Sequence, residues 1–169
     1  MPAIFFALLI FLTGTANAQT SEKIFSAEAR IFADDATPEI LLRYKNFSAD
    51  WIRRDTRENF FKLKFNREII SAMGSGINWH GALNFYDGKF LPSVGANFYV
   101  RIRPRVEVGF GFSAMTFGRR GHFTDFESGV KYFPQKNFSI GAGWRRVAFK
   151  SHTTDFVHSG AFVGVRYDF

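Results

Sequence analysis

Only one group of side chains has the types and spacing of a hydrolytic site. His152 and Thr154 are two residues apart, and Asp155 follows directly. A threonine hydroxyl acts as a nucleophile only with a base that takes its proton, a group that orients the base, and donors that stabilise the oxyanion. Nothing in the sequence supplies that set. We therefore expect no enzymatic activity and interpret these residues as part of a polar loop.

The histidines and glycines do not indicate a metal or cofactor site. The four histidines have no spacing typical of metal ligands: His80, His122, His152 and His158. The glycines recur at every second position of apolar segments and form no loop that could hold a phosphate. We expect neither a metal nor a cofactor, and we assign the glycines to packing.

The charged residues alternate with apolar ones, which indicates strands. The segment from Phe156 to Phe169 shows this best, with apolar groups at most odd positions. Most of its even positions carry small or polar groups: His158, Gly160, Gly164, Arg166 and Asp168. One face therefore suits lipid and the other a polar interior, which is the period-two pattern of a membrane barrel strand.

The same alternation predicts eight strands. They cover about 23–33, 59–70, 77–86, 91–102, 105–117, 122–133, 138–150 and 156–169, which leaves residues 34–58 as a long connection. Residues 38–54 also alternate, and the tetrapeptide at 45–48 repeats the turn at 136–139. If these residues form another hairpin, the barrel has ten strands. We favour eight strands, because the two segments within residues 38–54 have about eight residues each and are short for a tilted crossing of about 9–11 residues.

Composition supports a closed barrel rather than a helical membrane protein. Hydrophobic residues make up 46% of the chain, and there are 23 Phe and no Cys. The apolar residues mostly alternate with polar ones, and beyond the amino terminus no run is long enough for a spanning helix. In hydrocarbon every backbone group must be paired, so a sheet has to close on itself. The formal net charge of +7 suits contact with anionic headgroups, and no nucleic-acid motif is present.

The first residues have the pattern of a secretory signal peptide. Residues 3–12 are apolar, and Ala16-Asn17-Ala18 gives a small-x-small cleavage pattern. We expect residues 1–18 to be the signal peptide and residues 19–169 to be a single outer-membrane β-barrel domain.

The inward positions of the predicted strands form a mixed set of acids and bases. We expect them to pair in a charged network that fills the barrel, although a narrow path for water or ions is the alternative. This predicted network comprises Glu28, Arg30, Arg101, Glu107, Asp125, Glu127, Lys131, Arg145, Arg166 and Asp168, and Lys62, Lys64 and His80 also face inward. Aromatic residues near strand ends are predicted to form interfacial girdles: Trp79, Tyr86, Tyr99, Phe117, Tyr132, Phe133, Trp144, Phe149, Tyr167 and Phe169.

In this pattern the chain resembles the small OmpA/OmpX-like outer-membrane barrels of Gram-negative bacteria, most strongly over residues 91–169. The resemblance implies an antiparallel eight-stranded barrel, periplasmic termini and insertion by the barrel-assembly machinery. The last strand resembles the signal that this machinery reads. Gly164, Tyr167 and Phe169 fit that signal, whereas Phe162 stands where a polar residue is usual.

Lipid A deacylases of this architecture carry a His and a Ser two residues apart. Here His158 and Ser159 are adjacent and would point to opposite faces of a strand. A lipid A-modifying hydrolase is therefore kept only as an alternative.

We expect a monomeric, non-enzymatic barrel of the outer membrane with an envelope-structural or surface-interaction role. Its expected partners are outer-membrane lipids, lipopolysaccharide and the assembly machinery, with no nucleic acid. Arg119, Arg120 and His122 form a basic cluster that could contact a surface polyanion. A small porin-like channel is the first alternative, and a soluble exported barrel with its apolar face turned inward is another.

Overall fold

The chain folds into a closed antiparallel barrel of ten strands. The computed structural model describes residues 25–53, 59–72, 75–86, 88–116, 121–150 and 155–169. The strands are β1 (Phe25–Phe32), β2 (Pro38–Tyr44), β3 (Phe47–Arg53), β4 (Asn59–Ala72), β5 (Ser75–Tyr86), β6 (Lys89–Arg103), β7 (Val106–Thr116), β8 (His122–Gln135), β9 (Phe138–Lys150) and β10 (Asp155–Asp168).

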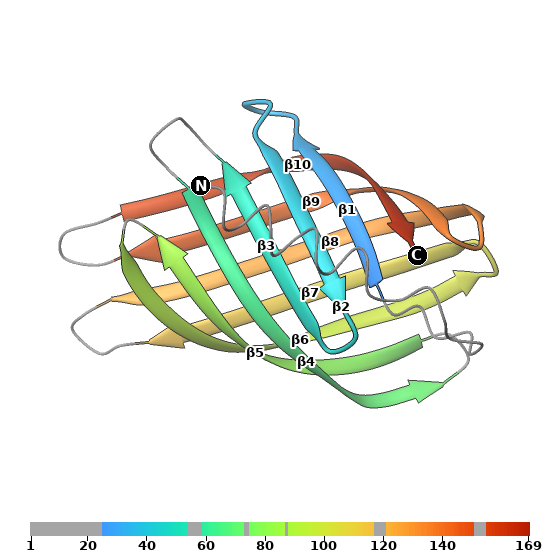
Figure 1. The fold of residues 1–169 in the computed structure, drawn as a ribbon, viewed down its shortest axis with the longest axis horizontal. Helices are drawn as coiled ribbons and strands as arrows, with labels where there is room; N and C mark the ends of the chain where they lie inside the picture. The colour runs from blue at the N-terminus through green and yellow to red at the C-terminus, as the bar shows by residue number, and fades with distance from the viewer. Residues whose placement is uncertain (1–24, 54–58, 73–74, 87, 117–120, 151–154) are drawn as a thin grey trace.

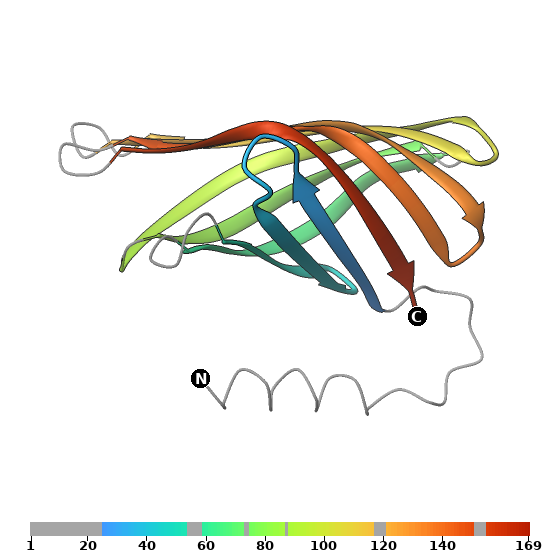
Figure 2. The same cartoon turned by 90° about the horizontal axis from the view of Figure 1, so that it is seen from above.

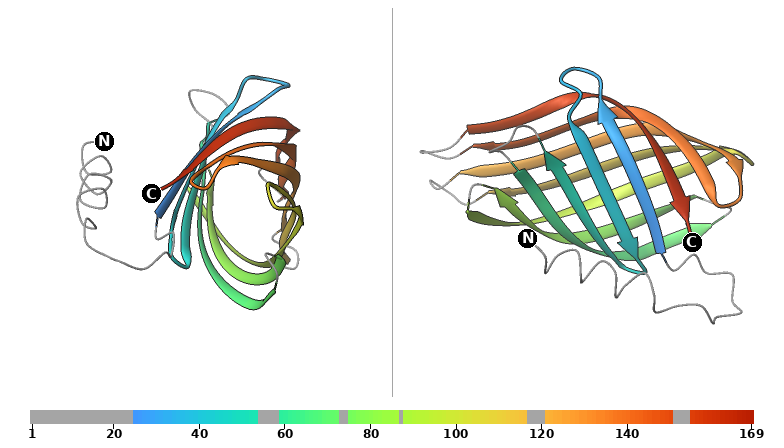
Figure 3. Two further views of the ribbon diagram at one scale, coloured as in Figure 1. Left: turned by 90° about the vertical axis from the view of Figure 1, so that its right-hand side faces the viewer. Right: turned by 45° about the horizontal axis from the view of Figure 1, so that its top comes forward.

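Each strand pairs with its neighbours in sequence, and β10 closes the barrel against β1 (Figure 1). The closing register runs from Ser26 opposite Asp168 to Phe32 opposite Phe162. Viewed along its longest axis, the sheet curls into a ring of strands (Figure 3, left). We refer to the end at which β1 begins and β10 ends as the terminus end, and to the opposite end as the loop end.

The structure corrects the preferred count of eight strands to the alternative of ten. Residues 34–58, expected to be mainly a long connection, contain β2 and β3 as a hairpin with Tyr44 opposite Phe47. Lys45 adopts a φ of 50°, which a tight two-residue turn requires. These strands have only seven residues each, but both are paired along both edges, so their backbone groups are satisfied despite their length.

The strands differ in length around the barrel. The three neighbours β1, β2 and β3 have 7 or 8 residues, whereas β4 to β10 have 11 to 15. The short strands lie side by side, so one section of the barrel wall is shorter than the rest (Figure 2). The barrel therefore has a short wall (β1–β3) and a long wall (β4–β10).

Side chains alternate between the outside and the lumen, as the period of two predicts. In β10, Val157, Val163 and Tyr167 are exposed, and His158 and Phe162 are buried inside. Gly143 of β9 occupies an inward position where a Cβ would lie 2.3 Å from the Ser128 carbonyl oxygen and 2.8 Å from the Phe162 ring. The glycine is required there because neighbouring strands and a large interior ring meet at that point.

The predicted signal peptide, residues 1–18, lies outside the described residues. Among the residues that the structure does describe, there is no helix long and apolar enough to cross a membrane.

Candidate functional site

The lumen is the candidate site, and Arg145 lies at the centre of its charged network. The side chain of Arg145 is 2% exposed. Its guanidinium contacts three carboxylates from three other strands: it pairs with Glu39 of β2, lies 2.7 Å from Asp50 of β3 and lies 2.9 Å from Asp125 of β8. Because β9 is not adjacent to β2 or β3, the contacts with Glu39 and Asp50 cross the lumen, whereas Asp125 belongs to the neighbouring strand.

Further ion pairs fix other strands across the same space. Arg30 of β1 reaches Glu127 of β8 at 2.8 Å and Glu28 of its own strand at 2.7 Å. Lys62 of β4 lies 2.7 Å from Asp125 of β8 and donates to the Ser113 hydroxyl at 3.0 Å. Charges buried in this way are stable only when paired, so the network fixes the relative positions of opposite walls.

Predicted network residues occupy different regions of the lumen. Glu28, Arg30, Asp125, Glu127, Lys131 and Arg145 lie in connected ion pairs. Arg166 pairs with Asp168 at 2.7 Å near the terminus end. Arg101 and Glu107 lie apart from them at the terminus end, 3.7 Å from each other, with 42% of the Arg101 side chain exposed.

Sequence reasoning missed two acids of the network, Glu39 and Asp50. Both belong to the residues expected to form a connection, and both are buried. The alternation of Ile40 and Leu42 in the sequence would have indicated that Glu39 faces inward, had the hairpin been preferred.

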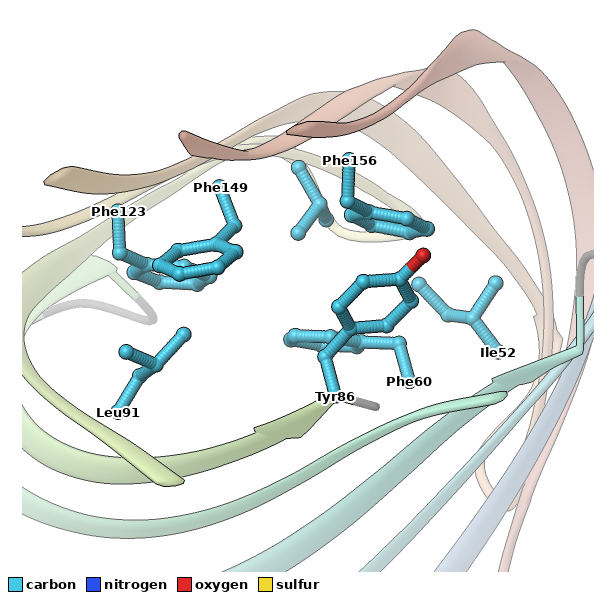
Figure 4. Packing of buried hydrophobic residues seen from close by; sticks show 8 residues of the cluster. Ile52, Phe60, Tyr86, Leu91, Phe123, Phe149 and Phe156 are labelled. Atoms are coloured by element: carbon cyan, nitrogen blue, oxygen red, sulfur yellow. The ribbon is translucent and has the colours of Figure 1, made fainter. Parts of the chain in front are cut away.

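A cluster of aromatic and aliphatic side chains, which we call the plug, fills the lumen toward the loop end (Figure 4). Its residues are Ile52, Phe60, Tyr86, Leu91, Phe123, Val147, Phe149 and Phe156. The Phe60 ring of β4 stacks with Phe123 of β8 and Phe156 of β10, with centroids 6.1 and 6.0 Å apart. None of these strands are neighbours, so the rings meet across the lumen.

Two aromatic residues predicted for the outer girdle belong to the plug instead. Tyr86 is 7% and Phe149 is 3% exposed, and both point into the barrel. Tyr86 shares its parity with the inward His80 and Asn84, and Phe149 shares its parity with Arg145. The girdle prediction followed residue type near strand ends, but the alternation of the strand decides the face. Tyr99, also predicted for the girdle, lines the lumen. Trp79, Tyr132, Trp144, Tyr167 and Phe169 are exposed as predicted, and Phe117 lies outside the described residues.

A cavity of about 410 Å³ occupies the lumen on the terminus side of the plug. Its floor carries the network residues Asp50, Lys62, Asp125 and Arg145, and its mouth is bordered by Lys45 and Glu107, next to turns of the terminus end. Within the described residues, no plug side chain lines this cavity. The lumen is thus closed by the plug at the loop end and open toward the terminus end, and we call its open half the cup.

The remaining candidates do not form a second site among the residues described. Residues 119, 120, 152 and 154 lie outside them, and His122 is exposed at the start of β8. His158 faces inward and Ser159 outward, so they do not share a site. In the described part of the chain there is no group of three or more His or acidic residues placed to hold a metal ion. Tyr167 and Phe169 are exposed beside one another at the end of β10, with ring centroids 4.9 Å apart.

Comparisons with known proteins give structural matches only. No protein-family model matches the chain, and no curated protein sequence does. The NanC porin structure is similar, with 8% identity, a TM-score of 0.51, and coverage of 86% of this chain and 100% of that one. The KdgM porin, solved in complex with disordered oligogalacturonate, has 14% identity and a TM-score of 0.50, covering 85% and 99%. At such identities the likeness concerns the fold, and this chain has the closed antiparallel fold of outer-membrane β-barrels.

Proposed function

We propose that this chain is an integral outer-membrane β-barrel with an envelope-structural role, whose lumen is closed to solutes. The observation that carries the proposal is the plug, because rings from β4, β8 and β10 stack across the barrel. Behind the plug, ion pairs from Arg145, Arg30 and Lys62 join opposite walls. The apolar plug opposes the passage of hydrated solutes, and the charged network behind it narrows the lumen.

The outer surface supports a membrane location. Large apolar side chains are exposed around the barrel, among them Phe47 at 60%, Val94 at 60% and Val163 at 62%. In water such a surface would favour aggregation, whereas lipid chains would cover it. The charged network lies inside the barrel and large apolar side chains cover its outside, which argues against the soluble barrel with an inward apolar face.

Resemblance to the OmpA/OmpX-like barrels remains part of the proposal, with monomeric insertion by the barrel-assembly machinery. The exposed aromatic pair Tyr167 and Phe169 at the end of β10 would be available to that machinery. Contacts of the outer face with lipids and lipopolysaccharide, including a polyanion at His122, belong to the same proposal.

A small porin-like channel is the second candidate. The cavity of about 410 Å³ favours it, as does the likeness in fold to two porins. The KdgM structure holds an acidic oligosaccharide, and the basic lining of the cavity in this chain would suit acidic solutes. A channel would require the plug to open.

Conductance in planar bilayers separates the two candidates. The refolded wild type, whose closed barrel is first verified by a mobility shift between unboiled and boiled samples, should give no conductance steps. The double variant Phe60→Ala/Phe156→Ala should give steps, because it removes the central rings of the plug.

The matched control is Phe61→Ala/Val157→Ala, which truncates the next residues on the same strands, where the side chains face outward. It should remain closed like the wild type. If the wild type gives conductance steps, the structural role is rejected in favour of the porin-like channel.

A further inference from the structure

The cavity in the cup carries more positive than negative charge. Seven bases line it, against four acids. Three of those acids, Asp50, Asp125 and Glu127, already pair with Arg145, Lys62 and Arg30 at its floor. The excess of bases therefore lies nearer the mouth: Arg43, Lys45, Lys64, Lys131 and Arg166.

Arg43 and Lys64, two of these bases, are not held in a close ion pair by any carboxylate of the described residues. Among the described residues, no carboxylate lies within ion-pair distance of the Lys64 ammonium. Of the carboxylates in the described ranges, Arg43 reaches only Glu28, at 3.8 Å. That carboxylate is already held by Arg30 at 2.7 Å and Lys131 at 3.0 Å. The guanidinium of Arg43 thus faces the cavity with most of its donors available.

The wall formed by β4, β5 and β6 presents neutral polar groups to the same cavity. Asn66, Asn78, Asn97 and Tyr99 line it. Within the described residues, the side-chain oxygen of Asn78 is buried and has no hydrogen-bond partner. The amide nitrogens of Asn66 and Asn97 are already hydrogen-bonded to neighbouring groups. The cations therefore supply the contacts to a ligand with several oxygen acceptors, and the Asn78 oxygen can accept from a hydroxyl or protonated oxygen of that ligand.

We propose that the cavity binds a small, soluble, multivalent oxyanion, of the phosphate or carboxylate class, which enters from the terminus end. Arg43 and Lys64 are its principal contacts. The anion lowers the electrostatic cost of keeping these cations inside the barrel. This site goes beyond the proposed function and does not depend on it, because a cup with a closed plug binds the anion as well as an open one does.

Calorimetric titration with inorganic pyrophosphate tests the site. The refolded barrel is kept in a zwitterionic detergent at low ionic strength, and its folding is verified by the mobility shift. We expect saturable binding of one pyrophosphate per barrel. Arg43→Gln/Lys64→Gln should weaken the affinity about tenfold or more, because it removes two charge-assisted contacts.

The matched control is Arg103→Gln/Arg105→Gln. It removes the same charge from exposed residues of the terminus end that do not line the cavity. Affinity should stay within about twofold of the wild type, since solvent screens these charges. Absence of saturable binding to the wild type, or an equal loss in both double variants, would overturn the site.

A lipid headgroup is the other possible source of the oxyanion, and lipid composition distinguishes it. The titration is repeated in nanodiscs of phosphatidylcholine and of phosphatidylglycerol. A similar pyrophosphate affinity in both kinds of nanodisc supports a soluble ligand. A decrease in phosphatidylglycerol that the Arg103→Gln/Arg105→Gln variant shows as well is assigned to general charge repulsion. If pyrophosphate binding is lost in phosphatidylglycerol but not in phosphatidylcholine, and this loss requires intact Arg43 and Lys64, the soluble ligand is rejected in favour of a lipid headgroup.

Discussion

Arg145 and Arg146 are neighbours in sequence with opposite environments. Arg145 is buried among carboxylates of three other strands, and Arg146 is exposed on the outer surface. The difference follows from the alternation of faces along β9. Removing a partner from a buried ion pair leaves uncompensated charge, so the two residues should contribute very differently to stability.

Arg145→Met should therefore destabilise the barrel by about 3–5 kcal/mol, because Asp50 would lose its cation and Glu39 would keep only the weaker contact with Arg30 among the described residues. Urea unfolding of the protein in lipid vesicles, followed by tryptophan fluorescence, measures this free energy. The control Arg146→Gln should change it by less than about 0.5 kcal/mol. Equal losses in both variants would show that Arg145 does not hold the network together.

At the scale of elements, the hairpin of β2 and β3 decides the architecture. It inserts two strands between β1 and β4, and it supplies Glu39 and Asp50 to the lumen. Without it, β1 would have to meet β4 directly, and the lumen would be narrower because the barrel diameter grows with the number of strands.

A disulfide between cysteines placed at Ala49 and Leu63 checks this hairpin. These residues are opposite each other on β3 and β4, so oxidation of Ala49→Cys/Leu63→Cys should crosslink them. The natural chain has no cysteine, so the readout by gel mobility is unambiguous. Ala49→Cys/Leu83→Cys is the control, since Leu83 lies one strand further on β5 and should not crosslink. Failure of the first pair to link would exclude the ten-stranded register.

The local features of the fold could be predicted from the sequence, and the contacts across the lumen could not. Alternation along β10 predicts which of Val163 and Arg166 faces outward, because strand geometry is fixed by adjacent residues. The pairing of Arg145 with Glu39 depends on how many strands close the barrel and in which register, which no local pattern contains. The plug was missed for a related reason: Phe60 and Phe123 lie far apart in sequence and meet only after closure.

At the scale of the whole molecule, the barrel has two chemically different halves. The loop half is filled with packed rings, and the terminus half holds a polar cavity. Solutes therefore have access to the lumen from one end only, as long as the plug keeps its packing. This one-sided access is what makes a binding cup compatible with a closed barrel.

The short wall of β1 to β3 has a consequence for the surrounding bilayer. A strand of eight residues is about 26 Å long, and at a tilt of about 40° it covers roughly 20 Å of membrane, less than the apolar band of about 25 Å usual for such barrels. The long wall exceeds that band, so lipids on one side meet a hydrophobic mismatch that lipids on the other side do not. We expect refolding to be more complete in vesicles of dilauroyl than of dioleoyl phosphatidylcholine, measured as the fraction of heat-modifiable protein. Equal yields would contradict this. If refolding shows this difference, the barrel thins the membrane beside β1–β3, and the lipid layer around the barrel does not have a uniform thickness.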